Sequence, residues 1–105
     1  MIFVETLIFT REQRDLLSDD DYRNLQLALL LRPEAGPIIP GSGGLRKVRW
    51  SLGARGKRGG LRVIYYWDKP KECIYMLLVY PKSRQDDLTQ TQLRTLRKLV
   101  KENLK

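Results

Sequence analysis

Residues 61–80 read LRVIYYWDKPKECIYMLLVY, and this stretch decides the fold. Its two runs, 61–67 and 73–80, are rich in β-branched and aromatic residues, which is typical of β-strands. The segment DKPKE between them predicts a turn, so the two strands should pair antiparallel. The second run is almost continuously apolar, which predicts a strand at the centre of a sheet with both faces covered.

A further strand is predicted just upstream, over residues 45–51 (LRKVRWS). Its side chains alternate, so that Val48 and Trp50 face one way while Lys47 and Arg49 face the other. Three successive strands with short connections predict a small antiparallel meander.

The connection between the first two strands of this meander, residues 52–60, reads LGARGKRGG. It is longer than an ordinary hairpin loop of about two to five residues. It carries Arg55, Lys57 and Arg58 and contains no acid. Positive charge on a glycine-rich backbone predicts a loop that contacts phosphate.

The N-terminal part of the chain predicts one strand and two helices. Residues 2–9 (IFVETLIF) have the composition of a strand, and residues 11–16 predict a short helical turn. Ser18 followed by three aspartates is typical of a helix start, because free N–H groups there favour oxygen and negative charge. Pro33 predicts that this helix ends near Arg32.

The remaining segments complete an α+β domain. Residues 33–44 (PEAGPIIPGSGG) predict a packed loop that leads to the sheet. Thr89 and Gln92 have the spacing of a capping box, and apolar residues at helical intervals predict a helix over 89–103. The expected order is β-α-α-β-β-β-α, and the length fits a single domain over residues 1–105.

The charge is unevenly distributed along the chain. The net charge is +8 overall, but residues 35–67 carry seven basic residues and no acid, whereas residues 1–34 carry four basic and seven acidic residues. Such asymmetry favours a polyanionic partner, either nucleic acid or an acidic protein. A charged surface that only confers solubility is the alternative.

The missing residue types exclude several kinds of chemistry. The chain has no histidine, which excludes a Ser-His-Asp triad and a histidine metal site. Cys73 is the single cysteine, so we expect no disulfide, no zinc cluster and a buried thiol in a reducing cytoplasm. No apolar run is long enough to span a membrane, and the first residues lack the features of a signal peptide. We expect no cofactor and no metal.

Basic side chains are therefore the candidates for function. Lys47 and Arg49 share a strand face, Arg62 opens the next strand, and Lys82 and Arg84 follow the last one. If the strands are neighbours, these residues converge on one side of the sheet, where they can hold a scissile phosphate. Cleavage of RNA also needs a base, and a lysine crowded by positive charge is a candidate.

Each of these residues also has a purely structural interpretation. Lys47 and Arg49 fit the solvent face of a half-exposed strand, and Lys82 and Arg84 fit a polar loop. Arg62 is harder to explain in this way, because it interrupts an apolar strand. Asp86 and Asp87 precede the last helix, and we expect them to stabilise its N-terminus.

The motifs together resemble the RelE/HigB superfamily of bacterial toxins, and within it the HigB-type branch. The resemblance rests on GGLRKVRW, ARGKRGG, LRVIYYW and LLVYPKSRQDDLT in this order, and it covers nearly the whole chain. It implies a RelE/ParE-like fold and a ribosome-dependent mRNA endonuclease, the toxin of a type II toxin–antitoxin system. The implied partners are the ribosome, mRNA and a cognate antitoxin.

The resemblance also implies roles for individual residues. The positions that match the basic catalytic residues of the family are Lys47, Arg49, Arg62, Lys82 and Arg84, the last with an alignment that can slip by one. The implied RNA-binding residues are Arg46, Arg55, Lys57 and Arg58. Some RelE members carry a functional tyrosine where this chain has Thr89 and its neighbours, so tyrosine chemistry is not expected here.

Two other functions fit the same fold. ParE-type relatives bind DNA gyrase and cut no nucleic acid, and a plain nucleic-acid-binding module would use the basic loop without catalysis. The clustered Lys47, Arg49, Arg62 and Lys82 favour the nuclease, because a gyrase inhibitor does not need them together.

Overall fold

The computed structural model describes residues 1–52 and 60–104. Within these residues the chain forms an α+β fold in which four strands make one sheet in the order β1-β4-β3-β2. The elements are β1 (Ile2–Glu5), α1 (Leu7–Leu16), α2 (Asp19–Leu31), β2 (Arg46–Trp50), β3 (Leu61–Asp68), β4 (Cys73–Pro81), α3 (Gln90–Leu99) and a π-helical segment, η2 (Val100–Leu104). The expected meander is confirmed, since β2, β3 and β4 pair antiparallel, and β1 adds parallel to β4.

The predicted first strand is wrong beyond Glu5. The Thr6 side chain accepts a hydrogen bond from the Phe9 amide at 3.0 Å and caps α1, so the following apolar residues are helical. Phe9 is fully buried and anchors α1 to the core. A short apolar run has the same composition in a strand and in a buried helix turn, which is why the sequence did not separate them.

The other helix ends agree with the sequence. Ser18 caps α2 by accepting a hydrogen bond from the Asp21 amide at 3.0 Å, and the helix ends at Leu31, close to Pro33. Thr89 and Gln92 form the expected capping box at the start of α3. This cap determines where the β4–α3 loop ends, which matters for the site described below.

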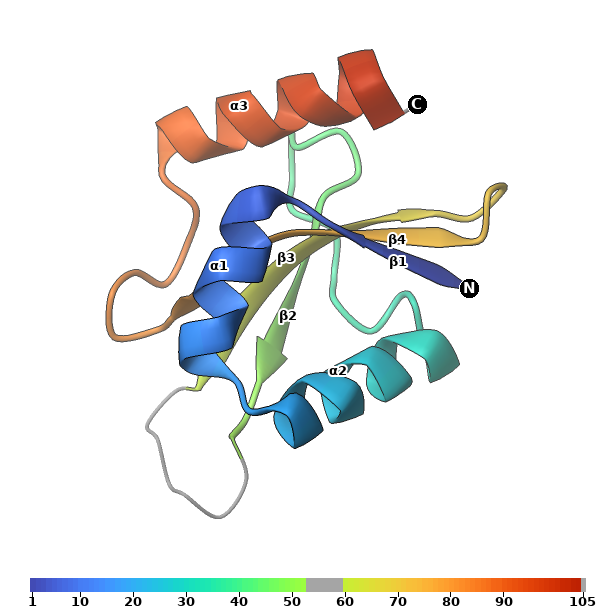
Figure 1. Cartoon of the computed structure of the whole chain (residues 1–105). Coiled ribbons are helices and arrows are strands. Elements are labelled where there is room, and N and C mark those ends of the chain that lie inside the picture. Colours follow the sequence, from blue (N-terminus) through green and yellow to red (C-terminus); the bar gives the residue numbers. More distant parts are fainter. Residues whose placement is uncertain (53–59, 105) are drawn as a thin grey trace.

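The sheet is covered on both faces (Figure 1). One hydrophobic cluster joins α1 and α2 to the sheet through residues such as Phe9, Leu25 and Tyr65. The second cluster packs α3 and η2 on the opposite face, around Ile64 and Val100. Because β3 and β4 are covered on both faces, both strands are almost continuously apolar in sequence.

The loop between α2 and β2 is held against the sheet by Tyr65. Its hydroxyl donates to the Pro33 carbonyl at 2.6 Å and accepts from the Gly36 amide at 2.9 Å. A Cβ at position 36 would lie 2.9 Å from the backbone of Lys47, so the glycine allows this close approach. The loop is therefore packed, as the sequence predicts, and it lies directly beside Lys47.

Replacing Tyr65 with phenylalanine should lower the free energy of unfolding by about 1–3 kcal/mol, because the buried Gly36 amide loses its acceptor. The measurement is urea denaturation, with Tyr66→Phe on the opposite face of the same strand as the control. Equal midpoints for the two variants would contradict this role of the hydroxyl.

No helix in the described part of the chain is long and apolar enough to cross a membrane.

Candidate nucleic-acid interface

The strand register places the predicted basic residues on one face of the sheet. Arg49 on β2 lies directly opposite Arg62 on β3, which in turn lies opposite Tyr80 on β4. Lys47 lies opposite Ile64 in the neighbouring row, and residues that pair across strands share a face. The expected convergence of Lys47, Arg49 and Arg62 is therefore confirmed as geometry, and their catalytic roles stay predictions.

Arg62 is the buried member of this group. The residue is only 3% exposed, and its Nε donates to Asp86 Oδ1 at 3.1 Å. A guanidinium at such burial needs a charged or hydrogen-bonding partner, because loss of hydration costs several kcal/mol. The Tyr80 hydroxyl donates to the Asp86 backbone carbonyl at 3.3 Å, so strand β4 also holds the segment that carries the partner.

Arg49 and Arg62 face each other with like charges. Directly opposed like charges destabilise a sheet pair. The Asp86 carboxylate offsets part of this repulsion from the side of Arg62, while Arg49 is solvent-exposed. An anion beside the exposed Arg49 would offset the remaining repulsion, and a phosphate has the right charge and oxygen geometry for an arginine.

Lys47 forms the second ion pair of the site. Its Nζ lies 2.5 Å from Asp87 Oδ1, and its side chain is 17% exposed whereas that of Asp87 is 80% exposed. The expectation that a lysine is crowded by positive charge is not met at Lys47, because a carboxylate is its closest charged partner. A phosphate that binds Lys47 must compete with Asp87 for the ammonium group.

The prediction for Asp86 and Asp87 as helix-stabilising residues is wrong. Thr89 and Gln92 satisfy the start of α3, and the two carboxylates turn instead to Arg62 and Lys47. Sequence reasoning thus missed two members of the site. The signal was present, since these are the only acids between residues 73 and 101.

The ion pair has a measurable consequence for Asp86. The hydrogen bond from Arg62 lowers the pKa of the Asp86 carboxyl below its usual 3.8, and the positive charges of Arg62, Lys47 and Lys82 act in the same direction. The contribution of this group to stability is therefore present above pH 3.8 and is lost as the pH falls through the lowered pKa.

We expect NMR titration of the Asp86 carboxyl carbon to give a midpoint below pH 3.8, and a midpoint closer to 3.8 in Arg62→Gln. Arg32→Gln, which removes an exposed arginine paired with Glu34, is the control and should leave the Asp86 midpoint at its wild-type value. If the Asp86 midpoint is the same in the wild type and in Arg62→Gln, the Arg62–Asp86 pair is absent in solution.

The structure separates Lys82 from Arg84. Lys82 lies close enough to Asp86 to lower the pKa of its carboxyl, and its amide donates to the Gly60 carbonyl at 3.1 Å. The Arg84 guanidinium instead lies 3.5 Å from Glu12 on α1. Lys82 thus belongs to the basic cluster, whereas Arg84 is directed to another element.

The predicted RNA-binding residues have different surroundings. Arg46 lies on the opposite face from Lys47; its guanidinium donates to the Gly36 carbonyl at 2.9 Å and lies over the Trp67 ring at 5.9 Å. These contacts give Arg46 a structural role in holding the α2–β2 loop. Arg55, Lys57 and Arg58 lie outside the described residues, so their contact with RNA stays a prediction.

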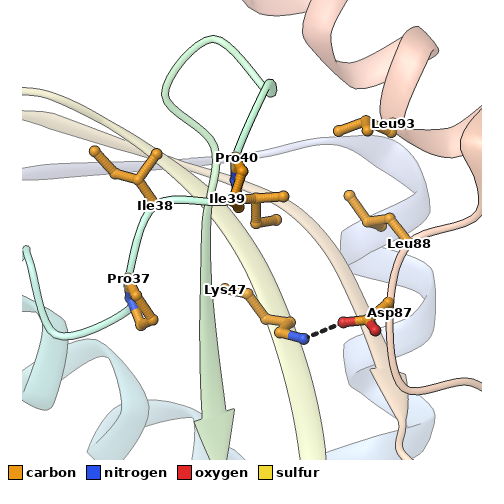
Figure 2. Close-up of a pocket in the computed structure, with 8 residues that line it drawn as sticks. All are labelled: Pro37, Ile38, Ile39, Pro40, Lys47, Asp87, Leu88 and Leu93. Atoms are coloured by element: carbon orange, nitrogen blue, oxygen red, sulfur yellow. Dashed lines mark hydrogen bonds and ion pairs between the residues drawn. The ribbon is translucent and has the colours of Figure 1, made fainter.

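A pocket adjoins the Lys47–Asp87 pair (Figure 2). Its volume is about 370 Å³, and it is lined by Pro37, Ile38, Ile39, Pro40, Lys47, Asp87, Leu88 and Leu93. Among residues 1–52 and 60–104, no three acidic or cysteine side chains come together as metal ligands would. The described site brings cationic side chains together with carboxylates beside them.

Solved structures that share this fold include two that contain the E. coli RelE or RelBE proteins. A chain of the intact E. coli RelBE toxin–antitoxin complex is 18% identical, with a TM-score of 0.59, and the match covers 76% of this chain and 94% of that chain. A double-arginine mutant of the E. coli toxin RelE in the free state is 17% identical, with a TM-score of 0.58, and the match covers 81% of this chain and 86% of that chain. No protein-family model matches the chain.

These comparisons define the class of structure to which the chain belongs. Its α+β architecture, with a four-stranded sheet in the described residues and helices on both faces, is that of RelE. At such low identity the likeness concerns the fold, and function has to be argued from the site.

Proposed function

We propose that this chain is a RelE-like toxin of a toxin–antitoxin system, which inhibits translation by cutting mRNA on the ribosome. The observation that carries the proposal is the nearly buried Arg62 opposite Arg49, with Lys47 on the same face of a RelE-like sheet. An arginine held inside a sheet by a half-exposed carboxylate is a costly arrangement for solubility alone.

In the proposed reaction the 2′-oxygen of the RNA attacks the adjacent phosphorus, and the 5′-oxygen of the next nucleotide leaves. Arg62 and Arg49 stabilise the negative charge that grows on the phosphate oxygens, and the pairing of Arg62 with Asp86 orients its guanidinium before the substrate arrives. Lys82, the lysine of the cluster that lies near Asp86, is the candidate to take the 2′-proton in its neutral form, and water protonates the leaving 5′-oxygen.

The partners of this function are the ribosome, mRNA and an antitoxin. The ribosome orders the message, which allows a small protein without histidine to act on it. One of the similar crystal structures is that of the E. coli RelBE toxin–antitoxin complex, and this supports an antitoxin for the present chain. The order of the GLRK, GKRGG and RVIYY motifs favours the HigB-type branch, and the ribosome implies action in the cytoplasm.

The test is to add the purified protein to an in vitro translation reaction and to map mRNA ends by primer extension, with naked mRNA as the control. We expect new ends only in the presence of translating ribosomes. Cuts on naked RNA would indicate a free ribonuclease. An intact message would overturn the proposal, and a supercoiling assay with DNA gyrase would then test a ParE-like activity.

A further inference from the structure

The pocket beside Lys47 is formed by two separate segments of the chain. Figure 2 shows Pro37, Ile38 and Ile39 on one side and Leu88 and Leu93 on the other. The Lys47 ammonium points across the space between them to Asp87. At about 370 Å³ the pocket lies within the size range of small-molecule sites, which are mostly apolar with a few polar groups.

Both walls are held in place before any ligand arrives. On one side the Ile39 amide donates to the Leu45 carbonyl at 2.8 Å, and two prolines restrict the backbone. On the other side the Thr89 cap fixes the start of α3 just after Leu88. Ile38 is 54% exposed, so it forms the solvent-facing lip of the pocket.

The polar groups of the pocket form a neutral pair. Lys47 and Asp87 offer one donor group and one acceptor group, and the walls around them are apolar. The exposed Asp87 carboxylate repels a phosphate, so we do not expect a phosphate in this pocket. An uncharged flat ring with donors and acceptors along one edge matches the pocket, since carboxylates accept from base amino groups and lysine donates to ring nitrogen or carbonyl oxygen.

The pocket also lies at a suitable distance from the arginine row. Lys47 and Arg49 are two residues apart on the same face of β2, which corresponds to about 7 Å along the strand. A phosphate held between Arg49 and Arg62 would therefore place its own or the neighbouring base near Lys47. This geometry links the pocket to the proposed phosphate site without any change in the fold.

We propose that the pocket between residues 37–40 and 87–93 binds one nucleobase of the RNA strand whose phosphate lies on the Arg49–Arg62 row. The inference rests on the proposed nuclease function and names the part of the substrate that this side of the site selects. Adenine, cytosine and guanine can donate to Asp87 from an exocyclic amine, and uracil can donate from its N3–H, so the pocket is proposed for a nucleobase and for no single base.

The test is direct binding of a short oligoribonucleotide whose 2′-hydroxyls are replaced by hydrogen to prevent cleavage. An otherwise identical strand lacks one base. In methyl NMR we expect the intact strand to shift the signals of Ile38, Ile39, Leu88 and Leu93. The abasic strand should shift them less and bind about fivefold more weakly, because it buries less apolar surface.

Ile38→Trp at the exposed lip fills the pocket and should make the two strands bind equally. Leu31→Trp, at a 79% exposed position on α2, should preserve the difference. The proposal is overturned if wild-type protein binds both strands equally, if neither strand binds at millimolar concentration, or if Ile38→Trp still distinguishes them. If the pocket instead holds a side chain of a protein partner, the methyl signals will show no shift that depends on the base.

This outcome is separable from that of the translation experiment. Base-dependent binding together with an uncut message would contradict the nuclease and support the pocket. Ribosome-dependent cutting without base-dependent binding would support the nuclease and overturn the pocket.

Discussion

Replacing Arg62 with alanine is expected to lower ribosome-dependent cleavage by about 100-fold or more, the usual cost of removing one group that stabilises transition-state charge. Arg62 is the residue best placed for this role, because its guanidinium is held by Asp86 and faces Arg49 across the strand pair. The measurement is the rate at which new mRNA ends appear in a translation reaction. Arg62→Lys keeps the charge but loses the planar fork, and an intermediate rate is expected.

The matched control is Arg32→Ala, which removes an arginine whose side chain is 73% exposed and lies 3.8 Å from the exposed Glu34 carboxylate. Its cleavage rate should equal that of the wild type. The Arg62→Ala protein should still fold and bind its antitoxin, since Asp86 is 52% exposed and water can solvate it after the arginine is lost. A folded Arg62→Ala protein with full activity would refute the proposed phosphate site.

Replacing Gly60 with alanine is expected to cost about 3 kcal/mol of stability or more. The residue has φ of +58°, which favours glycine, and an added Cβ would overlap the Trp50 carbonyl oxygen and lie 3.1 Å from its carbon. Both strained contacts are with backbone, so neither can be relieved by a rotamer change. Thermal unfolding should show a melting temperature lower by about 15 °C.

Gly41 provides the comparison for Gly60. It has φ of +70°, but nothing lies within 4 Å of an added Cβ, so Gly41→Ala meets only the backbone cost. That cost is about 1 kcal/mol, or about 5 °C in melting temperature. Similar losses for the two variants would mean that the close approach of Gly60 to β2 does not exist in solution.

Several features of the fold followed from local patterns. The runs at 61–67 and 73–80 are strands because β-branched and aromatic residues fill a sheet that is covered on both faces. Ser18 and Thr89 mark helix starts because their side chains bind amides only three residues away. Such signals lie within a few residues of each other, so the sequence contains them completely.

Other features depended on contacts between distant segments. Thr6 begins a helix within an apolar run, and this was settled by the packing of Phe9 in the core, not by composition. Arg46 and Lys47 are adjacent and equally basic in sequence, yet the sheet places them on opposite faces with different partners. The alternation along β2 predicted the separation but not the carbonyl and ring that engage Arg46.

The basic character of the site was determined by the sequence alone, because the acid-free span 35–67 and the absence of histidine leave few other chemistries. The pairing of Asp86 with Arg62 and of Asp87 with Lys47 was decided only by the tertiary structure. Ion pairs join residues 24 and 40 positions apart here. Strand register and the position at which the Thr89 cap ends the β4–α3 loop decide which of these distant residues meet. Local sequence specifies neither the distance nor the direction between them.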